Sequence, residues 1–88
     1  MNELVFSSEG WQDYLYWQTQ DRKTLKRINA LLASIQRDGP ANGLGKPEAL
    51  RHEPGWSRRI NEQDRLLYHV MESGDIRVTS LRGHYNDS

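Results

Sequence analysis

The chain has 88 residues, a length that suits one domain with a single core, and its twelve basic and twelve acidic side chains cancel to a net charge of zero. The balanced charge gives no support to a nucleic-acid partner, and the absence of cysteine excludes disulfides and thiolate zinc sites. The N-terminus lacks the basic flank and long apolar run of a signal peptide, and no stretch suits a membrane span, so we expect a soluble cytoplasmic protein.

The N-terminal segment predicts a short strand that leads into an aromatic helix. Leu4–Phe6 is an apolar run of strand type, and the side chain of Ser7 or Ser8 can cap a helix that starts near Glu9. Four aromatic rings within seven residues also suit a platform on which bases stack. Their helical spacing instead favours a face packed on a core, so we assign them to the core and, as a second use, to a dimer surface. These residues are Trp11, Tyr14, Tyr16 and Trp17.

A second helix is predicted to begin after Asp21, whose carboxylate can cap it, and to end at the sequence Asp38-Gly39-Pro40. Five aliphatic side chains recur at helical spacing along this segment and form one stripe, the clearest periodicity in the chain. A basic cluster lies largely off that stripe, where it suits a solvated helix face and equally a contact with RNA. The stripe comprises Leu25, Ile28, Leu31, Leu32 and Ile35, and the cluster comprises Arg22, Lys23, Lys26 and Arg27.

The second half of the chain predicts a loop and then three strands. Residues 41–55 hold three glycines and two prolines, which is the composition of a loop. Strands are expected at 56–61, 65–71 and 76–81, separated by short polar breaks that suit antiparallel hairpins. A strand, two helices and then a meander indicate one α+β domain over residues 1–88, in which both helices pack on one face of a small antiparallel sheet.

Side chains alternate across each predicted strand, so the sheet is expected to carry arginine on an open face. Within residues 56–61, Arg58 and Arg59 point to opposite faces, and Arg65 begins the next strand. Whichever face meets the helices, the other face carries arginines in neighbouring strands. A solvated sheet face with arginines can bind a polyanion such as RNA.

Glu48 in the loop and the pair His84-Tyr85 near the C-terminus add the remaining groups that RNA cleavage needs. RNA supplies its own nucleophile, the 2′-hydroxyl, so a protein contributes a base, an acid and cations for the phosphate. Stacking on an aromatic ring can hold the bases so that attack is in line. The residues alone leave the plainer alternative open, in which Glu48 is a solvated loop acid and His84-Tyr85 a frayed end.

Four short motifs in a fixed order make the chain similar to a known family. They are "GKPE", "WSRRI", "RLLY" and "HY", which are specific as a set although none would be specific alone. With them the chain resembles the YoeB family of toxins from bacterial toxin–antitoxin systems, within the RelE-like superfamily. The matching segments cover nearly the whole chain: "SEGWQDYLYWQTQDRKTLKRINALL", "GLGKPEALRH", "WSRRINEQDRLLYHV" and "RGHY".

The resemblance implies the RelE-like microbial RNase fold and a ribosome-dependent mRNA endonuclease that cuts codons in the decoding site, with no cofactor and no metal ion. It also implies a YefM-like antitoxin that wraps an extended segment over the active face, a homodimer, and contact with operator DNA only through the antitoxin. RelE-like relatives of the ParE type instead poison DNA gyrase, and a toxin-like protein can serve only as an antitoxin-binding corepressor. Glu48 together with His84-Tyr85 favours the enzyme.

The family's functional residues carry over onto matching positions of this sequence. Glu48 matches the general base, Arg65 the arginine that stabilises the phosphate, and His84 the general acid. Tyr85 matches the aromatic residue that positions or stacks on the substrate base. Two further cations would help to hold the phosphate: Lys46 and Arg59.

The sequence departs from the family pattern at three places. Asp64 stands where relatives often have histidine, and it can pair with Arg65 and weaken the pull of that arginine on phosphate. The segment between Glu48 and Trp56 is about two residues shorter than in familiar members, which bears on the reach of Glu48. Residues 86–88 follow the His-Tyr pair, with which the family usually ends.

Overall fold

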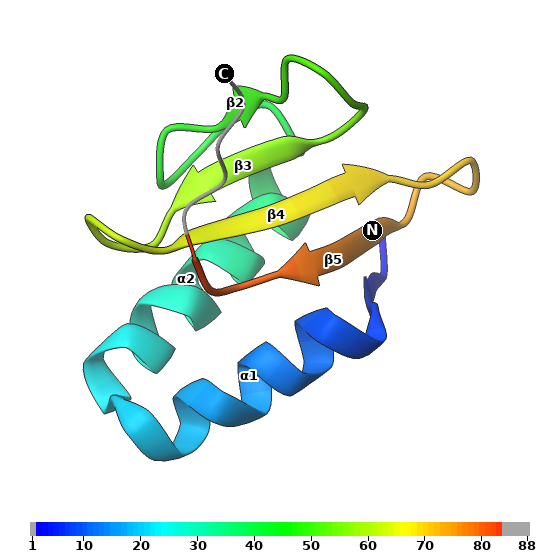
Figure 1. Ribbon diagram of the computed structural model, residues 1–88. Helices are drawn as coiled ribbons and strands as arrows, with labels where there is room; N and C mark the ends of the chain where they lie inside the picture. The colour runs from blue at the N-terminus through cyan, green and yellow to red at the C-terminus, as the bar shows by residue number, and fades with distance from the viewer. Residues whose placement is uncertain (1, 84–88) are drawn as a thin grey trace.

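The chain folds into five strands and two helices across residues 2–83, the part that this computed structural model describes. Both helices lie on the same side of the sheet, and the opposite side carries no helix (Figure 1). The elements are β1 (Leu4–Phe6), α1 (Ser8–Gln20), α2 (Arg22–Asp38), β2 (Glu48–Ala49), β3 (Trp56–Arg59), β4 (Arg65–Val70) and β5 (Ile76–Ser80).

The strand order in the sheet is β1-β5-β4-β3-β2. The predicted meander of β3, β4 and β5 is antiparallel, and β2 continues it at one edge. At the other edge β1 runs parallel to β5, with Leu4 opposite Ile76 and Phe6 opposite Val78. The prediction of an α+β fold with the helices on one face is confirmed, but the sheet is mixed rather than wholly antiparallel. Two helices separate β1 from the other strands, so no hairpin dictates the direction in which it docks.

Both helices begin at the residues that the sequence predicts. The Ser7 side chain accepts a hydrogen bond from the Gly10 amide and caps α1. Asp21 alone separates α1 from α2, and its carboxylate accepts bonds from the amides of Lys23 and Thr24. The hydroxyl of Thr24 donates a further bond of 2.8 Å to the same carboxylate. These bonds, the one from the Thr24 hydroxyl foremost, lower the pKa of Asp21.

The core forms where the aliphatic stripe of α2 meets the covered face of the sheet. The predicted core role of the aromatic helix is confirmed for Trp17, which is buried and donates its indole N–H to the carbonyl of Leu81 at 2.9 Å. Trp11, by contrast, stays 48% exposed. The buried apolar side chains are Trp17, Ile28, Leu31, Leu32, Ile35, Ile60, Leu66, Tyr68, Ile76, Val78 and Leu81.

Candidate functional site on the open face of the sheet

Strand alternation decides which arginines reach solvent. Arg58 is fully buried under the helices, together with Leu66 on the neighbouring strand, to which it is paired. Arg59 therefore lies on the open face, directly opposite Arg65. The predicted open face with arginines on adjacent strands is present, and it is built by β3 and β4.

Glu48 and Arg65 come together on this open face. The Glu48 carboxylate lies 3.9 Å from a terminal nitrogen of the Arg65 guanidinium. The Glu48 side chain is 67% exposed, whereas that of Arg65 is 19% exposed. Because the pair is long and the Glu48 carboxylate is exposed to solvent, it contributes at most about 1 kcal/mol to stability.

The position of Glu48 comes from an edge strand that the sequence reading missed. The predicted loop contains β2, a two-residue strand that pairs with β3 and sets Glu48 opposite Ser57. Ser57 lies opposite Leu67 on the next strand, so the side chains of Glu48, Ser57 and Leu67 point to the same face of the sheet. The shortened segment after Glu48 therefore does not keep its carboxylate from reaching Arg65.

The two predicted phosphate-binding cations, Lys46 and Arg59, are connected by a backbone hydrogen bond that involves Gly45. The Arg59 amide donates a bond of 2.8 Å to the carbonyl of Gly45, the residue before Lys46. Lys46 has a φ of 52°, a left-handed conformation that costs energy outside glycine and persists only where the surroundings hold it. Both side chains are exposed. The open face thus brings Glu48, Arg59 and Arg65 together, and Lys46 follows the residue whose carbonyl accepts the Arg59 amide.

Arg58 holds the 39–45 loop, which precedes Lys46 and Glu48 in the chain. Its Nε donates to the Tyr68 hydroxyl at 2.8 Å, and one terminal nitrogen donates to Ser34 Oγ and to the Leu44 carbonyl. The other terminal nitrogen donates to the carbonyls of Gly39 and Asn42, with that of Pro40 at 3.4 Å. All five N–H donors of the guanidinium are therefore used inside the protein.

Arg58 was missed as a structural residue by the sequence reading, although a signal was available. It shares its strand face with Trp56 and Ile60, two apolar residues at even spacing, and this spacing places it on the covered face. Its loop also needs glycine, because a side chain at Gly43 would overlap the hydroxyl of Ser34 and the carboxylate of Asp38. Gly43 thus permits the close contact of this loop with α2.

Asp64 does not weaken Arg65 by pairing with it, contrary to the expectation from the sequence. Its carboxylate accepts a bond of 2.8 Å from the amide of Gly83, while the ion pair of Arg65 is with Glu48. His84 and Tyr85, the predicted general acid and base-stacking residue, lie outside the described residues. The structure therefore brings together three of the six predicted site residues, Glu48, Arg59 and Arg65, and the roles of all six stay predictions.

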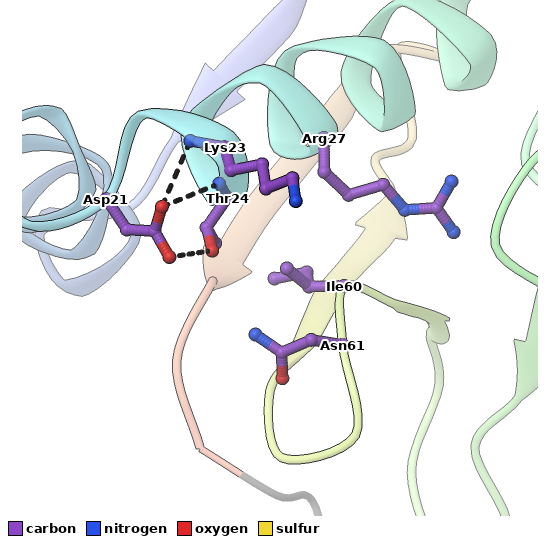
Figure 2. Close-up of a pocket in the computed structure, with 6 residues that line it drawn as sticks. All are labelled: Asp21, Lys23, Thr24, Arg27, Ile60 and Asn61. Carbon is purple, nitrogen blue, oxygen red and sulfur yellow. Dashed lines mark hydrogen bonds between the residues drawn. The ribbon is translucent and has the colours of Figure 1, made fainter.

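A shallow hollow elsewhere on the surface contains none of the predicted site residues. It lies between the first turn of α2 and the end of β3, as Figure 2 shows. Its only carboxylate belongs to Asp21, which is occupied in capping α2. We therefore place the candidate site on the open face. The hollow is lined by Asp21, Lys23, Thr24, Arg27, Ile60 and Asn61.

Within residues 2–83, no group of three or more histidine, aspartate or glutamate side chains is arranged to hold a metal ion. Neither of the two helices in that range is long and apolar enough to cross a membrane.

Two helices on one face of a small mixed sheet, with an acid and arginines on the other face, are the arrangement expected of a RelE-like toxin. The family described as YoeB-like toxin of bacterial type II toxin–antitoxin system matches residues 6–85. Toxin YoeB of Mycobacterium bovis is 44% identical over 88 residues, which cover 98% of this chain and 99% of the relative. The chain belongs to the YoeB family and is the toxin of a type II toxin–antitoxin system.

Solved structures of the same family superpose closely on this chain. The structure of a YoeB dimer from Staphylococcus aureus gives a TM-score of 0.86 at 41% identity, and the match covers 96% of this chain and 98% of that one. A YoeB-YefM complex from Staphylococcus aureus gives a TM-score of 0.85 at 40% identity, with 97% and 99% covered. The similarity therefore extends over nearly the whole of each chain.

Proposed function

We propose that this toxin is an endoribonuclease that cleaves mRNA on the ribosome, in the decoding site, by metal-independent acid–base chemistry. The observation that carries the proposal is the juxtaposition of Glu48 and Arg65, 3.9 Å apart on an open sheet face that also presents Arg59. A substrate phosphate beside Arg65 would place the preceding ribose near the exposed carboxylate. This arrangement suits attack by a nucleophile that the RNA itself brings.

The reaction follows from the groups on this face. Glu48 takes the proton of the 2′-hydroxyl, and the 2′-oxygen attacks the adjacent phosphorus. Arg65, with Lys46 and Arg59, stabilises the charge that develops on the phosphoryl oxygens. His84 protonates the departing 5′-oxygen, so the products carry a 2′,3′-cyclic phosphate and a 5′-hydroxyl.

Tyr85 completes the proposed site by stacking on a base next to the scissile bond. Ring–base stacking contributes about 1–3 kcal/mol per base and does not depend strongly on the base. It therefore helps to hold the ribose and phosphate in line without demanding one nucleotide sequence. His84 and Tyr85 are adjacent in the sequence, so one backbone segment would present both groups to the substrate.

The proposed partners follow the family. The Staphylococcus aureus structures are described as a YoeB dimer and as a YoeB-YefM complex. We infer for this chain a homodimer and a YefM-like antitoxin that covers the open face, with operator DNA contacted only through that antitoxin. The ribosome and mRNA are cytoplasmic, and the proposed activity places the toxin there.

The decisive experiment combines the toxin with ribosomes programmed with a defined mRNA and analyses the ends of the products. We expect cleavage only on ribosomes, with 2′,3′-cyclic phosphate and 5′-hydroxyl ends. Arg65→Ala and His84→Ala should each slow single-turnover cleavage by roughly 10²-fold. The matched control is Arg77→Ala, which removes the same charge from β5 and should cleave normally.

Three results would contradict the proposal. The first is 3′-hydroxyl products, which a protein using the 2′-hydroxyl as nucleophile does not make. The second is an equal loss of activity in Arg65→Ala and Arg77→Ala, since that would reduce the role of Arg65 to overall charge. The third is inhibition of DNA gyrase in a supercoiling assay without cleavage of mRNA, which would identify a poison of the ParE type.

A further inference from the structure

The segment that leads into the C-terminal pair is held firmly by α1. The amide of Leu81 donates to the carboxylate of Asp13 at 2.9 Å, and its carbonyl accepts the indole N–H of Trp17 at 2.9 Å. The guanidinium carbon of Arg82 lies 3.6 Å from the centre of the Tyr16 ring, in cation–π contact. Residues 81–83, here named the tail root, are therefore fixed against the body of the protein.

Gly83, the last residue of the tail root, has both of its backbone groups bonded to two adjacent residues. Its amide donates to the Asp64 carboxylate at 2.8 Å, and its carbonyl accepts from the Arg65 amide at 3.0 Å. Gly83 has a φ of 87°, which an L side chain adopts only with strain. The two bonds and this conformation fix the backbone of Gly83, the residue that precedes His84 in the sequence.

The Asp64 carboxylate is itself oriented by the turn between β3 and β4. The carbonyl of Asp64 accepts bonds from the amides of Ile60 and Asn61, and the Asn61 side chain accepts bonds from the amides of Gln63 and Asp64. The turn thus forms without using the carboxylate of Asp64. A rigid turn that holds a spare hydrogen-bond acceptor against the tail root has the properties of a positioning device.

We propose that Asp64 is a positioning residue for the general acid, acting through the backbone of Gly83 on His84. The inference rests on the proposed function. Asp64 and Arg65 are neighbours in sequence, and both bond to Gly83. One short stretch of backbone therefore holds Gly83 and also carries the arginine proposed to bind the phosphate. We infer that this stretch of backbone limits the distance between the acid and the phosphate. Proton transfer needs such fixed geometry, and a misplacement of 1 Å can cost about 10²-fold in rate.

The test compares Asp64→Ala with Asp64→Asn. Alanine removes the acceptor, whereas asparagine keeps an oxygen that can accept the Gly83 amide but removes the charge. We expect single-turnover cleavage of ribosome-bound mRNA to slow by roughly tenfold or more in Asp64→Ala and to stay near wild type in Asp64→Asn. Equal loss in both variants would show that the charge matters rather than the bond, and it would overturn the inference.

A second substrate separates positioning of the acid from general damage. In an mRNA whose scissile linkage carries sulfur in place of the 5′-oxygen, the leaving group is a thiolate that departs without a proton. On this substrate Asp64→Ala and His84→Ala should both cleave as fast as wild type. An Asp64→Ala defect that persists there would overturn the inference, because the loss would not pass through the acid.

Hydrogen exchange and a matched control complete the design. The Gly83 amide should exchange roughly tenfold faster in Asp64→Ala than in wild type, and this readout does not require activity. Failure of wild type to cleave mRNA would contradict the proposed function. An unprotected Gly83 amide in wild type would instead contradict the hydrogen bond between Gly83 and Asp64 on which the inference rests. Asp75→Ala is the control: it removes a similar carboxylate–amide bond, to Glu3 at 3.0 Å, and should cleave normally.

Discussion

The two faces of the sheet hold arginine side chains in opposite surroundings. Arg58 and Arg59 are consecutive in β3, yet Arg58 is fully buried with every donor bonded inside the protein, whereas Arg59 is exposed beside the paired Glu48 and Arg65. A buried guanidinium must satisfy its donors internally, so it stabilises one arrangement of the loop around it. An exposed guanidinium keeps its donors available for a phosphate.

The 39–45 loop connects the two faces. From the covered face it is held by Arg58 and by the hydroxyl of Tyr68, which donates to the Pro40 carbonyl at 2.6 Å. Beyond this loop the same chain continues through Lys46 into β2, which carries Glu48 on the open face. Stability and proposed catalysis are thus carried by different side chains of one connected structure. Variants should therefore separate the two properties, and the predictions below test that separation.

The largest expected effect is on stability, from Arg58→Met. Arg58 is fully buried, and removing its guanidinium leaves the part-buried carbonyls of Gly39, Asn42 and Leu44 without their donor. We expect the free energy of unfolding, measured by urea denaturation, to fall by about 3 kcal/mol. Arg59→Met, the same substitution one residue along, should change it by less than about 0.5 kcal/mol. Equal stability of the two variants would remove the distinction between the faces.

The next effect is on activity alone, from Glu48→Gln. Loss of the base should slow cleavage of ribosome-bound mRNA by roughly 10²-fold. The free energy of unfolding should stay within about 0.5 kcal/mol of wild type, because the pair with Arg65 is long and the Glu48 carboxylate is exposed. Glu62→Gln, an exposed acid in the turn between β3 and β4, is the control and should leave both quantities unchanged. A large loss of stability in Glu48→Gln would mean that the open face also carries the fold.

The smallest effect concerns an exposed carboxylate whose bonds are all local. Hydrogen bonds from Thr24 and Lys23 hold the pKa of Asp21 below its ordinary value, so its charge stabilises the folded state above about pH 4 and that contribution is lost as the pH falls through the lowered pKa. Asp21→Asn should therefore melt at a lower temperature than wild type at pH 7. The difference should shrink in thermal melts below about pH 4, and a constant difference would contradict this assignment.

Much of the fold was predictable from local patterns. The stripe on α2, the serine and aspartate caps and the three alternating strands all follow from spacing that each segment carries within itself. The parallel docking of β1 and the short strand β2 were not predictable, because each depends on a partner strand distant in the sequence. The residue pattern within a single segment does not specify which distant strand it pairs with.

The sequence by itself determined which groups the protein possesses: an acid in "GKPE", arginines in "WSRRI" and "RLLY", and the order that marks the family. Tertiary structure alone decided that Arg58 stabilises while Arg59 faces solvent, and that Asp64 bonds Gly83 rather than Arg65. The reason is that burial and hydrogen-bond partners are set by which distant segments the fold brings together. Charge and residue type are local properties, whereas the use of a charge depends on its surroundings.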